Sequence, residues 1–385
     1  MKPPGLALFF THGISLQDWV EAGFLEREMS YYQRLGESVG GITFVTYGGV
    51  EDACLAATLE GIQVLPNRYG QASQRFSLTA PWQYRRQLAS VRIFKSNQIV
   101  GAWTAMIAKW LFRGKLIVRG GHIRLIHATQ DEANWPRLVR VWLAEAIGLW
   151  VADGVILATE EMVDYAVRVY KLPKKKIYLV PNFVETEVFT PSLASGEPGL
   201  IGFVGRFTPQ KNLPALIEAV AGLDNVRLRL IGDGPLLSQL AAQARSVGVS
   251  VEFPGKVPNH DLPAYLSQCQ AFAFPSHYEG HPKALLEAMA CGLPVITTPV
   301  KGIKNLIQHR ENGYLCADTS AAAISQGVRA VMQDETLRQH LARQARQYVV
   351  ENFSLEKILE RELDIYREMG LLSSTRPKND HHTQS

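Results

Sequence analysis

FPSHYEGHPKALLEAMAC, residues 274–291, predicts a polar loop followed by a helix, and the segments on either side of it predict strands. Residues 270–274 form a short apolar strand before the loop. Pro282 suits the first helical turn, because its missing N–H would have no intrahelical partner there. Gly292 ends the helix, and residues 293–297 return as the next strand. This order of strand, helix and strand is typical of a parallel, doubly wound α/β sheet.

Two glutamates in this stretch, Glu279 in the loop and Glu287 in the helix, are eight residues apart. Ligands of open α/β sheets bind in the crevice beyond the carboxyl ends of the strands, so both carboxylates can meet one ligand there. Carboxylates accept hydrogen bonds from hydroxyls, which a sugar or a ribose offers in pairs. The alternative is a solvated glutamate in a loop and an ion-paired glutamate on a helix.

The framework around the two glutamates, EG-x-P-x-x-L-x-EAMA-x-G-x-PV, resembles the E-x7-E signature of retaining glycosyltransferases. These are the glycogen-synthase-like and sucrose-synthase-like enzymes of glycosyltransferase family 4. The resemblance implies the α/β GT-B fold, in which two Rossmann-like domains with parallel, doubly wound sheets face each other across a cleft. It covers roughly the whole chain, and its specific motifs lie between Asn182 and Gly313.

A second motif, GFVGRFTPQKN at residues 202–212, follows a predicted strand. Asn212 is a predicted N-cap, so Arg206 and Lys211 come to lie beside a helix N-terminus, where backbone N–H groups and the helix dipole favour an anion. Arginine adds a bidentate fork for phosphate and lysine a point charge. Two solvated loop cations are the alternative. The match to the family pattern GxxGRxxxxK implies that these two residues hold the diphosphate of a nucleotide-sugar.

The N-terminal half matches the family less closely. The usual Gly-Gly loop after the first strand is replaced by Thr11-His12-Gly13-Ile14, so Gly13 alone would let backbone approach the phosphate. His122 follows a predicted strand, where family members often carry a histidine that faces the transferred sugar. The alternative is that His122 has a structural role, with its hydrogen bonds satisfied within the fold.

The resemblance implies a division of roles among these residues. Glu287 would bind the ribose, Glu279 the transferred sugar, and the amides of residues 280–285 would complete the cradle. The residues implied in catalysis are Arg206, Lys211, Glu279 and His122. Those implied in donor binding are Gly13, Arg206, Lys211, Val257, Glu279, Gly280, His281, Ala284, Leu285 and Glu287.

Neither a metal nor another cofactor is expected. No Asp-x-Asp triplet occurs, and the four cysteines lack the spacing of a zinc site or a disulfide framework. The expected donor is a UDP- or GDP-sugar. The acceptor is unidentified, with a lipid-linked sugar or a polysaccharide as the expectation, which suggests polysaccharide biosynthesis.

The length of 385 residues suits two domains. The predicted organisation is an N-terminal acceptor-side domain at 1–189, a linker at 190–198, a nucleotide-sugar-binding domain at 199–352, a helix at 353–369 and a disordered tail at 370–385. The resemblance implies that this helix crosses back to the N-terminal domain. No apolar run is long enough for a spanning helix and no signal peptide is evident, so a cytoplasmic location is expected.

The net charge of +4 conceals a strong asymmetry. Residues 61–130 contain eleven Lys or Arg and no Asp or Glu, whereas the rest of the chain carries 29 basic and 36 acidic residues. Aromatic residues are interspersed among the basic residues of this block. An anionic membrane surface attracts such a segment, which would make the protein peripherally membrane-associated. The alternative is a solvated basic face, and no nucleic-acid-binding motif is present.

Two other functions stay open. A nucleotide-sugar 2-epimerase with the GT-B fold would need acid and base groups that the sequence does not identify. A non-catalytic sugar-nucleotide-binding protein would bind donor without turnover, and the complete set of Arg206, Lys211, Glu279 and Glu287 argues against it.

Overall fold

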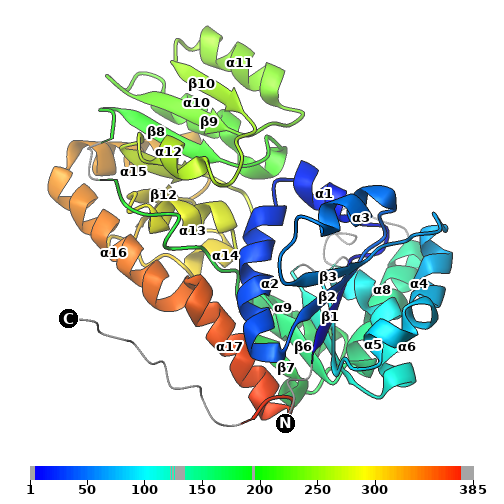
Figure 1. Cartoon of the computed structure of the whole chain (residues 1–385). Coiled ribbons are helices and arrows are strands. Elements are labelled where there is room, and N and C mark those ends of the chain that lie inside the picture. The colour runs from blue at the N-terminus through cyan, green and yellow to red at the C-terminus, as the bar shows by residue number, and fades with distance from the viewer. Residues whose placement is uncertain (1–4, 122, 124, 126–134, 193–195, 374–385) are drawn as a thin grey trace, which may run out of the picture. The chain divides into compact units, whose positions relative to one another are not determined.

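The computed structural model describes the chain except for residues 1–4, 122, 124, 126–134, 193–195 and 374–385. By its internal contacts the chain divides into two compact units (Figure 1). Unit 1 comprises Met1–Val180 and Leu359–Ser385, and unit 2 comprises Pro181–Ile358. Among the described residues, no helix is both long and apolar enough to cross a membrane.

The described part of unit 1 contains a seven-stranded sheet in which every neighbouring pair is parallel. The strand order is β3-β2-β1-β4-β5-β6-β7, so the direction of winding reverses between β1 and β4. The strands are β1 (Leu6–Phe9), β2 (Ile42–Val45), β3 (Ile62–Leu65), β4 (Ile93–Ser96), β5 (Lys115–Gly120), β6 (Gly154–Leu157) and β7 (Ile177–Leu179).

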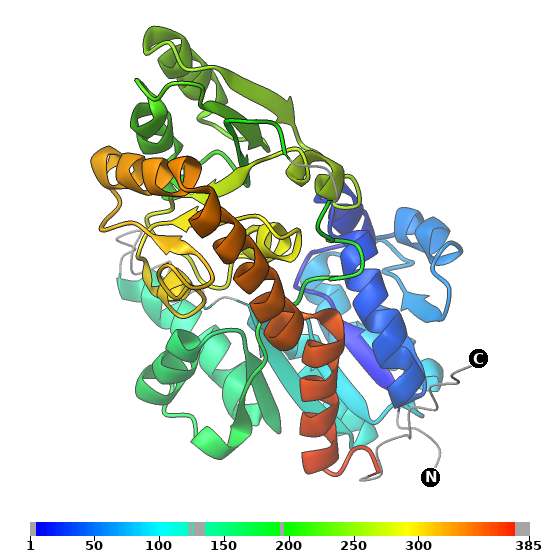
Figure 2. The same ribbon diagram turned by 90° about the vertical axis from the view of Figure 1, so that its left-hand side faces the viewer.

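Helices cover both faces of this sheet because side chains of each strand alternate between the faces. On one face, Phe94 packs in the core with Phe76, Ala105 and Leu149, which come from α4, α6 and α8. On the other face, Lys95 lies against α2 and α17, and Figure 2 shows these two helices on the same side of the sheet. The helices of the unit are α1 (Leu16–Glu21), α2 (Leu25–Val39), α3 (Val50–Ala56), α4 (Ser73–Gln83), α5 (Arg85–Leu88), η1 (Ile99–Gly101), α6 (Ala102–Phe112), α8 (Trp135–Val151), α9 (Glu160–Val169), η2 (Lys174–Lys176) and most of α17 (Leu355–Glu368).

The sheet of unit 2 has six strands among the described residues, again all parallel, in the order β10-β9-β8-β11-β12-β13. The strands are β8 (Leu200–Val204), β9 (Arg227–Ile231), β10 (Val251–Gly255), β11 (Ala271–Phe274), β12 (Val295–Thr297) and β13 (Tyr314–Leu315). The helices are η3 (Pro209–Lys211), α10 (Leu213–Val220), α11 (Leu237–Ser246), α12 (Leu262–Leu266), α13 (Lys283–Ala290), α14 (Lys301–Lys304), α15 (Ala321–Gln333) and α16 (Glu335–Phe353).

Two parallel α/β sheets confirm the predicted fold class. The sequence did not indicate β3, β4 or β13. In β4 the sequence IFKS carries Lys95, a residue type that is usually exposed, and here it is fully buried.

The boundary of unit 1 falls after Val180, whereas the sequence placed it at residue 189. Residues 181–189 pack within unit 2 because α16 holds them. The Arg346 guanidinium donates to the carbonyl oxygens of Thr186 and Phe189 at 2.8 and 2.6 Å. Val184 also pairs with Ser354 just after α16. The predicted linker, 190–198, and tail, 370–385, lie partly outside the described residues.

Candidate donor site

The two sequence motifs meet at the carboxyl edge of the unit 2 sheet. β8 and β11 are neighbours, so the loops that follow them emerge side by side. The His277 N–H donates to the Gln210 carbonyl at 2.8 Å, and the Gln210 side-chain amide donates to the Tyr278 carbonyl at 2.8 Å. These bonds join the loop that carries Arg206 and Lys211 to the loop that carries Glu279.

Lys211 and Glu279 form an ion pair at this junction. Lys211 Nζ lies 2.5 Å from Glu279 Oε1, and 15% and 7% of the two side chains are exposed. The ammonium also lies 4.9 Å from the centroid of the Phe274 ring. The sequence motifs predicted separate ligands for these residues, whereas the structure brings them together. Each therefore holds the other in place, and Lys211 is fixed in the segment that follows β8.

Arg206 differs from Lys211 in its surroundings. Its side chain is exposed. No hydrogen bond or ion pair joins it to the other described residues. With Glu279 neutralising Lys211, the three side chains carry a net charge of +1. The arrangement therefore leaves a cation facing solvent that can meet an anionic ligand.

Asn212 fixes the end of the Arg206 loop in an unexpected way. It occupies the N-cap position of α10, as predicted, but its side chain makes no capping hydrogen bond. The side-chain amide instead donates to the carbonyl oxygens of Pro275 and Thr319, at 3.1 and 2.9 Å. Its backbone is left-handed, with φ of 52°, which asparagine tolerates better than most residues. Asn212 thus ties three loops together.

The turn after β9 supports the same loop from the other side. The Phe207 N–H donates to the Asp233 carbonyl at 2.8 Å. A Cβ atom at Gly232 would lie 2.0 Å from the Gly205 carbonyl oxygen, and one at Gly234 would lie 2.4 Å from that of Phe207. Only glycine permits this approach. The Gly232-Asp233-Gly234 turn thus positions the backbone next to Arg206.

Glu287 lies on α13 and is 5% exposed. Its Oε1 atom accepts a hydrogen bond from Asn259 Nδ2 at 3.1 Å. Asn259 lies two residues after Val257 in the loop after β10, so this hydrogen bond connects the loop of one predicted donor-binding residue to the predicted ribose ligand Glu287. Sequence reasoning missed Asn259 because a polar residue in a loop carries no signal until a contact shows its partner.

The loop between Glu279 and α13 approaches α14 closely. A Cβ atom at Gly302 would lie 2.0 Å from the Gly280 carbonyl oxygen. α13 begins at Lys283, and Pro282 is its N-cap, so the prediction that Pro282 occupies the first turn is wrong by one residue. Ala284 and Leu285 lie in this first turn, where backbone N–H groups lack intrahelical acceptors.

The His281 ring does not extend into solvent. Its centroid lies 5.0 Å from that of Phe353, and neither of its buried nitrogens has a hydrogen-bond partner among the described residues. Burial, with a smaller effect from Lys283, lowers the pKa of His281 to about 4. The His281 carbonyl accepts from Asn182 Nδ2 at 2.7 Å. The ring therefore serves as a neutral packing group, and backbone is the part of His281 suited to donor binding.

Replacing His281 with phenylalanine is expected to flatten the dependence of stability on pH. In the unfolded chain this histidine has a pKa near 6.5, whereas in the folded protein its pKa is about 4. Between these pH values the unfolded chain binds a proton that the folded protein does not. Wild-type stability therefore falls as pH drops through this interval, by about 2 kcal/mol at pH 4.5. Urea unfolding of both proteins at pH 7 and pH 4.5 measures the difference. An identical loss in the two proteins would show that His281 takes up its proton freely in the folded state.

Two of the predicted site residues, Gly13 and His122, belong to unit 1. Gly13 follows β1 and has a left-handed backbone, with φ of 81°, so the glycine is required for its conformation. Next to it, His12 Nδ1 lies 3.1 Å from Ser77 Oγ of α4. His122 lies outside the described residues, and its predicted role stays a prediction. The described residues contain no group of three or more His, Cys, Asp or Glu that could hold a metal ion.

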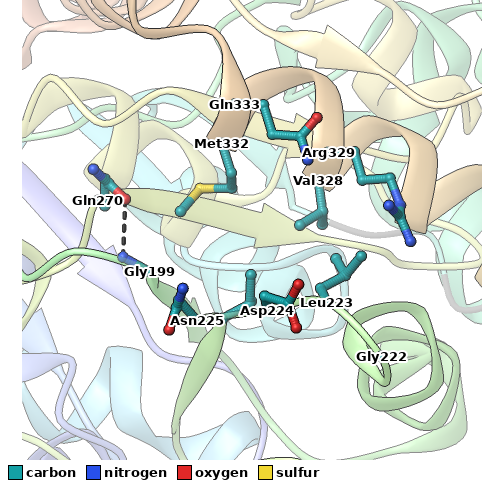
Figure 3. Close-up of a pocket in the computed structure, with 11 residues that line it drawn as sticks. Gly199, Gly222, Leu223, Asp224, Asn225, Gln270, Val328, Arg329, Met332 and Gln333 are labelled. Atoms are coloured by element: carbon teal, nitrogen blue, oxygen red, sulfur yellow. Dashed lines mark hydrogen bonds between the residues drawn. The ribbon is translucent and has the colours of Figure 1, made fainter.

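A separate cavity of about 230 Å³ lies at the opposite edge of the unit 2 sheet (Figure 3). Gly199, Asn225 and Gln270 precede β8, β9 and β11, so the cavity adjoins the amino ends of these strands. The Gln270 side-chain oxygen accepts from the Gly199 N–H at 2.9 Å. Ligand sites of such sheets lie at the carboxyl ends, so this cavity is not a candidate donor site.

Both halves of the chain match models of known glycosyltransferase families. Residues 184–348 match the model of glycosyl transferases group 1, and residues 39–188 match that of glycosyltransferase family 4. The chain belongs to the group 1 glycosyltransferases of family 4. The family that the sequence motifs predicted is therefore confirmed.

Individual relatives are distant. The N-acetyl-alpha-D-glucosaminyl L-malate synthase of Bacillus anthracis is 28% identical over 234 residues, which are 57% of this chain and 60% of that protein. A glycogen synthase of Mycobacterium tuberculosis is 25% identical over 260 residues, which are 63% and 62% of the two chains. The matched region thus spans about six tenths of the length of these two relatives.

A solved structure shares the fold over nearly the full length. HepE from Anabaena, crystallised in complex with UDP, superposes with a TM-score of 0.74 and 18% identity. The superposition covers 96% of this chain and 100% of that one. At this identity the likeness establishes the fold alone, and it agrees with two Rossmann-like units.

Proposed function

We propose that this protein transfers a sugar from a UDP- or GDP-sugar to an acceptor hydroxyl, with retention of anomeric configuration. One observation carries the proposal. The Lys211–Glu279 pair and the unpartnered Arg206 converge at the carboxyl edge of the sheet, where this class of sheet binds ligands. Relatives of the chain include a glycosyl-malate synthase and a glycogen synthase, and a structural relative binds UDP.

In this proposal Arg206 and Lys211 bind the donor diphosphate. The acceptor oxygen bonds to the anomeric carbon as the bond between this carbon and phosphate oxygen breaks. The departing nucleoside diphosphate takes the acceptor proton, so no protein base is required. Negative charge on the leaving phosphate grows during this step, and fixed cations stabilise the transition state more than the ground state.

Glu279 and Glu287 serve as hydroxyl acceptors in the same scheme. Glu279 already accepts from Lys211, and its second oxygen remains for a hydroxyl of the transferred sugar. Glu287 accepts from Asn259 and would bind ribose hydroxyls. First-turn amides of α13, at Ala284 and Leu285, would add to the phosphate cradle together with Gly280 and His281 backbone. For Gly13 and His122 of unit 1, the proposal keeps the predicted roles toward the donor phosphate and the transferred sugar.

Thermal and urea unfolding in the presence of a panel of nucleotide-sugars tests donor binding. A donor at about 100 times its Kd is expected to raise the free energy of unfolding by about 2.7 kcal/mol, because it binds the folded state alone. Arg206→Gln should reduce this gain. Arg245→Gln, which removes an exposed cation from α11 of the same unit, should leave it unchanged. If none of the nucleotide-sugars in the panel stabilised the protein, the result would contradict the proposal.

Incubation with the stabilising donor then separates the enzyme classes. A transferase is expected to release nucleoside diphosphate rapidly when an acceptor sugar or lipid-linked sugar is supplied. Conversion of the donor sugar to its 2-epimer without acceptor would instead establish the epimerase alternative. Binding without turnover in any acceptor screen would favour the sugar-nucleotide-binding alternative.

A further inference from the structure

Three helices of unit 1 share one face of the sheet. α6 packs against both α4 and α8, and the inward sides of all three contribute to the core. Figure 1 shows α4, α5, α6 and α8 gathered on one side of the unit. The opposite sides of these helices therefore point away from the core.

The outward side of α6 is apolar. Trp103, Ile107 and Trp110 follow one another at helical spacing, and Trp110 is 63% exposed. Only Lys109, in the last turn of this helix, is charged, and it pairs with Asp153. An ordinary surface helix has polar residues on its outward side, whereas α6 exposes apolar side chains there.

α8 repeats the pattern beside it. Trp135, Val139 and Leu143 lie four residues apart along one exposed stripe, and Trp135 is 73% exposed. All the exposed tryptophans among the described residues lie on these three helices: Trp82, Trp103, Trp110, Trp135 and Trp150. The basic block of the sequence ends at residue 130, so α8 extends the surface beyond that block.

The same helices and the C-cap of α6 carry exposed arginines: Arg75, Arg85, Arg86, Arg113 and Arg140. From residue 61 to residue 144 the chain contains two acids, Asp131 and Glu132, which lie outside the described residues. Glu145 of α8 is 1% exposed and accepts a hydrogen bond from the Tyr170 hydroxyl. The described outward face of α4, α5, α6 and α8 therefore combines tryptophan with uncompensated positive charge.

We propose that this face docks on the surface of an anionic lipid bilayer. Tryptophan prefers the boundary between headgroups and acyl chains, and arginine prefers headgroup phosphate. The combination of tryptophan and arginine therefore matches a bilayer surface with apolar acyl chains below a layer of negatively charged headgroups. A second copy of the chain fits less well, because two such faces would bring like charges together without acids between them.

This inference does not rest on the proposed function. Arg206, Lys211, Glu279 and Glu287 lie in unit 2, and none of the residues on the docking face belongs to the candidate donor site. A failure of docking would leave donor-induced stabilisation intact, and a failure of donor binding would leave docking intact.

Flotation of the full-length chain with phosphatidylcholine vesicles and with vesicles containing about 30% phosphatidylglycerol tests the proposal. Strong binding is expected only to the anionic vesicles, with a blue shift of tryptophan fluorescence. Arg85→Gln/Arg86→Gln should weaken binding about 30-fold, since each basic residue near an anionic surface contributes a factor of about five. Trp110→Ser/Trp135→Ser should weaken it at least about tenfold and remove most of the blue shift.

The matched control is Arg245→Gln/Val247→Ser, which alters an exposed cation and an exposed apolar residue on and beside α11 of unit 2. It should bind vesicles like the wild type. Circular dichroism and thermal unfolding check that all variants fold. Equal flotation with neutral and anionic vesicles, or equal binding by the control and the docking-face variants, would overturn the proposal. Dimerisation lost in the tryptophan variant, without vesicle binding by the wild type, would assign the face to a second copy instead.

Discussion

Lys211→Met is expected to lower kcat/KM by about 10- to 150-fold, the range that corresponds to one charged hydrogen bond of about 1.5–3 kcal/mol. Methionine keeps most of the length of the side chain and removes its charge. The loss should appear in kcat when the contact strengthens in the transition state, as expected for a cation beside a departing diphosphate. Steady-state kinetics with the donor identified in the stability screen provide the measurement.

The same substitution also leaves Glu279 without its ion-pair partner, so stability must be separated from catalysis. Only 7% of the Glu279 side chain is exposed, and an unpaired carboxylate there is expected to cost about 1–3 kcal/mol of unfolding free energy. Lys211→Met/Glu279→Gln removes both charges and should recover much of that stability. Activity should not recover with it. A double variant that regained wild-type kcat would show that catalysis requires neither the charge of Lys211 nor that of Glu279, and it would contradict both assigned roles.

Lys95→Met is expected to lower the free energy of unfolding by about 3–5 kcal/mol, because it leaves a charge buried without its partner. Lys95 is fully buried on β4 and pairs with Glu362 of α17, 267 residues later in the chain. The Tyr31 hydroxyl donates to the other carboxylate oxygen at 2.5 Å. The pair therefore joins the last helix to the sheet of unit 1. Urea unfolding monitored by circular dichroism measures the loss.

Acid titration checks the same pair. Burial alone would raise the pKa of the Glu362 carboxyl, but the Lys95 ammonium and hydrogen bonds from Lys95 and Tyr31 bring it below its ordinary value. The carboxylate thus contributes stability at pH values above the unfolded pKa of about 4.3, and this contribution disappears as pH falls through the folded pKa. Glu362→Gln should lose this part of the acid dependence.

Two controls make the prediction for Lys95 specific. Lys95→Met/Glu362→Leu replaces the ion pair by apolar groups and should recover most of the lost stability. Asp364→Asn breaks an ion pair at 2.5 Å with Arg367 on the same helix, but half of the Asp364 side chain is exposed. Its effect should stay below about 1 kcal/mol. If Asp364→Asn cost as much as Lys95→Met, burial of the pair would not explain its contribution.

The fold class was predictable because local patterns repeat along the chain. Apolar strands alternate with helices, and residues 274–291 place a loop, a helix start and two carboxylates in a specific order. β4 escaped prediction because Lys95 interrupts its apolar pattern. The reason for a lysine there is Glu362, and no local window contains both residues.

The candidate site shows the same division. The sequence identified Arg206, Lys211, Glu279 and Glu287 from motif spacing, since the residue types and their order suffice to indicate an anion and hydroxyls. It did not indicate the Lys211–Glu279 pair or the Asn259–Glu287 hydrogen bond. These contacts depend on which strands are neighbours, and strand order is set by packing across the sheet.

The sequence by itself therefore determined the class of the protein: two parallel α/β units, a phosphate-type loop and an E-x7-E segment. Tertiary structure alone decided which charges meet. It paired Lys211 with Glu279, buried Lys95 against Glu362 and brought the tryptophans of α4, α6 and α8 to one face of unit 1. Spacing along the chain fixes local conformation over a few residues, whereas side-chain partners tens or hundreds of residues apart are fixed only by the packing of helices on sheets.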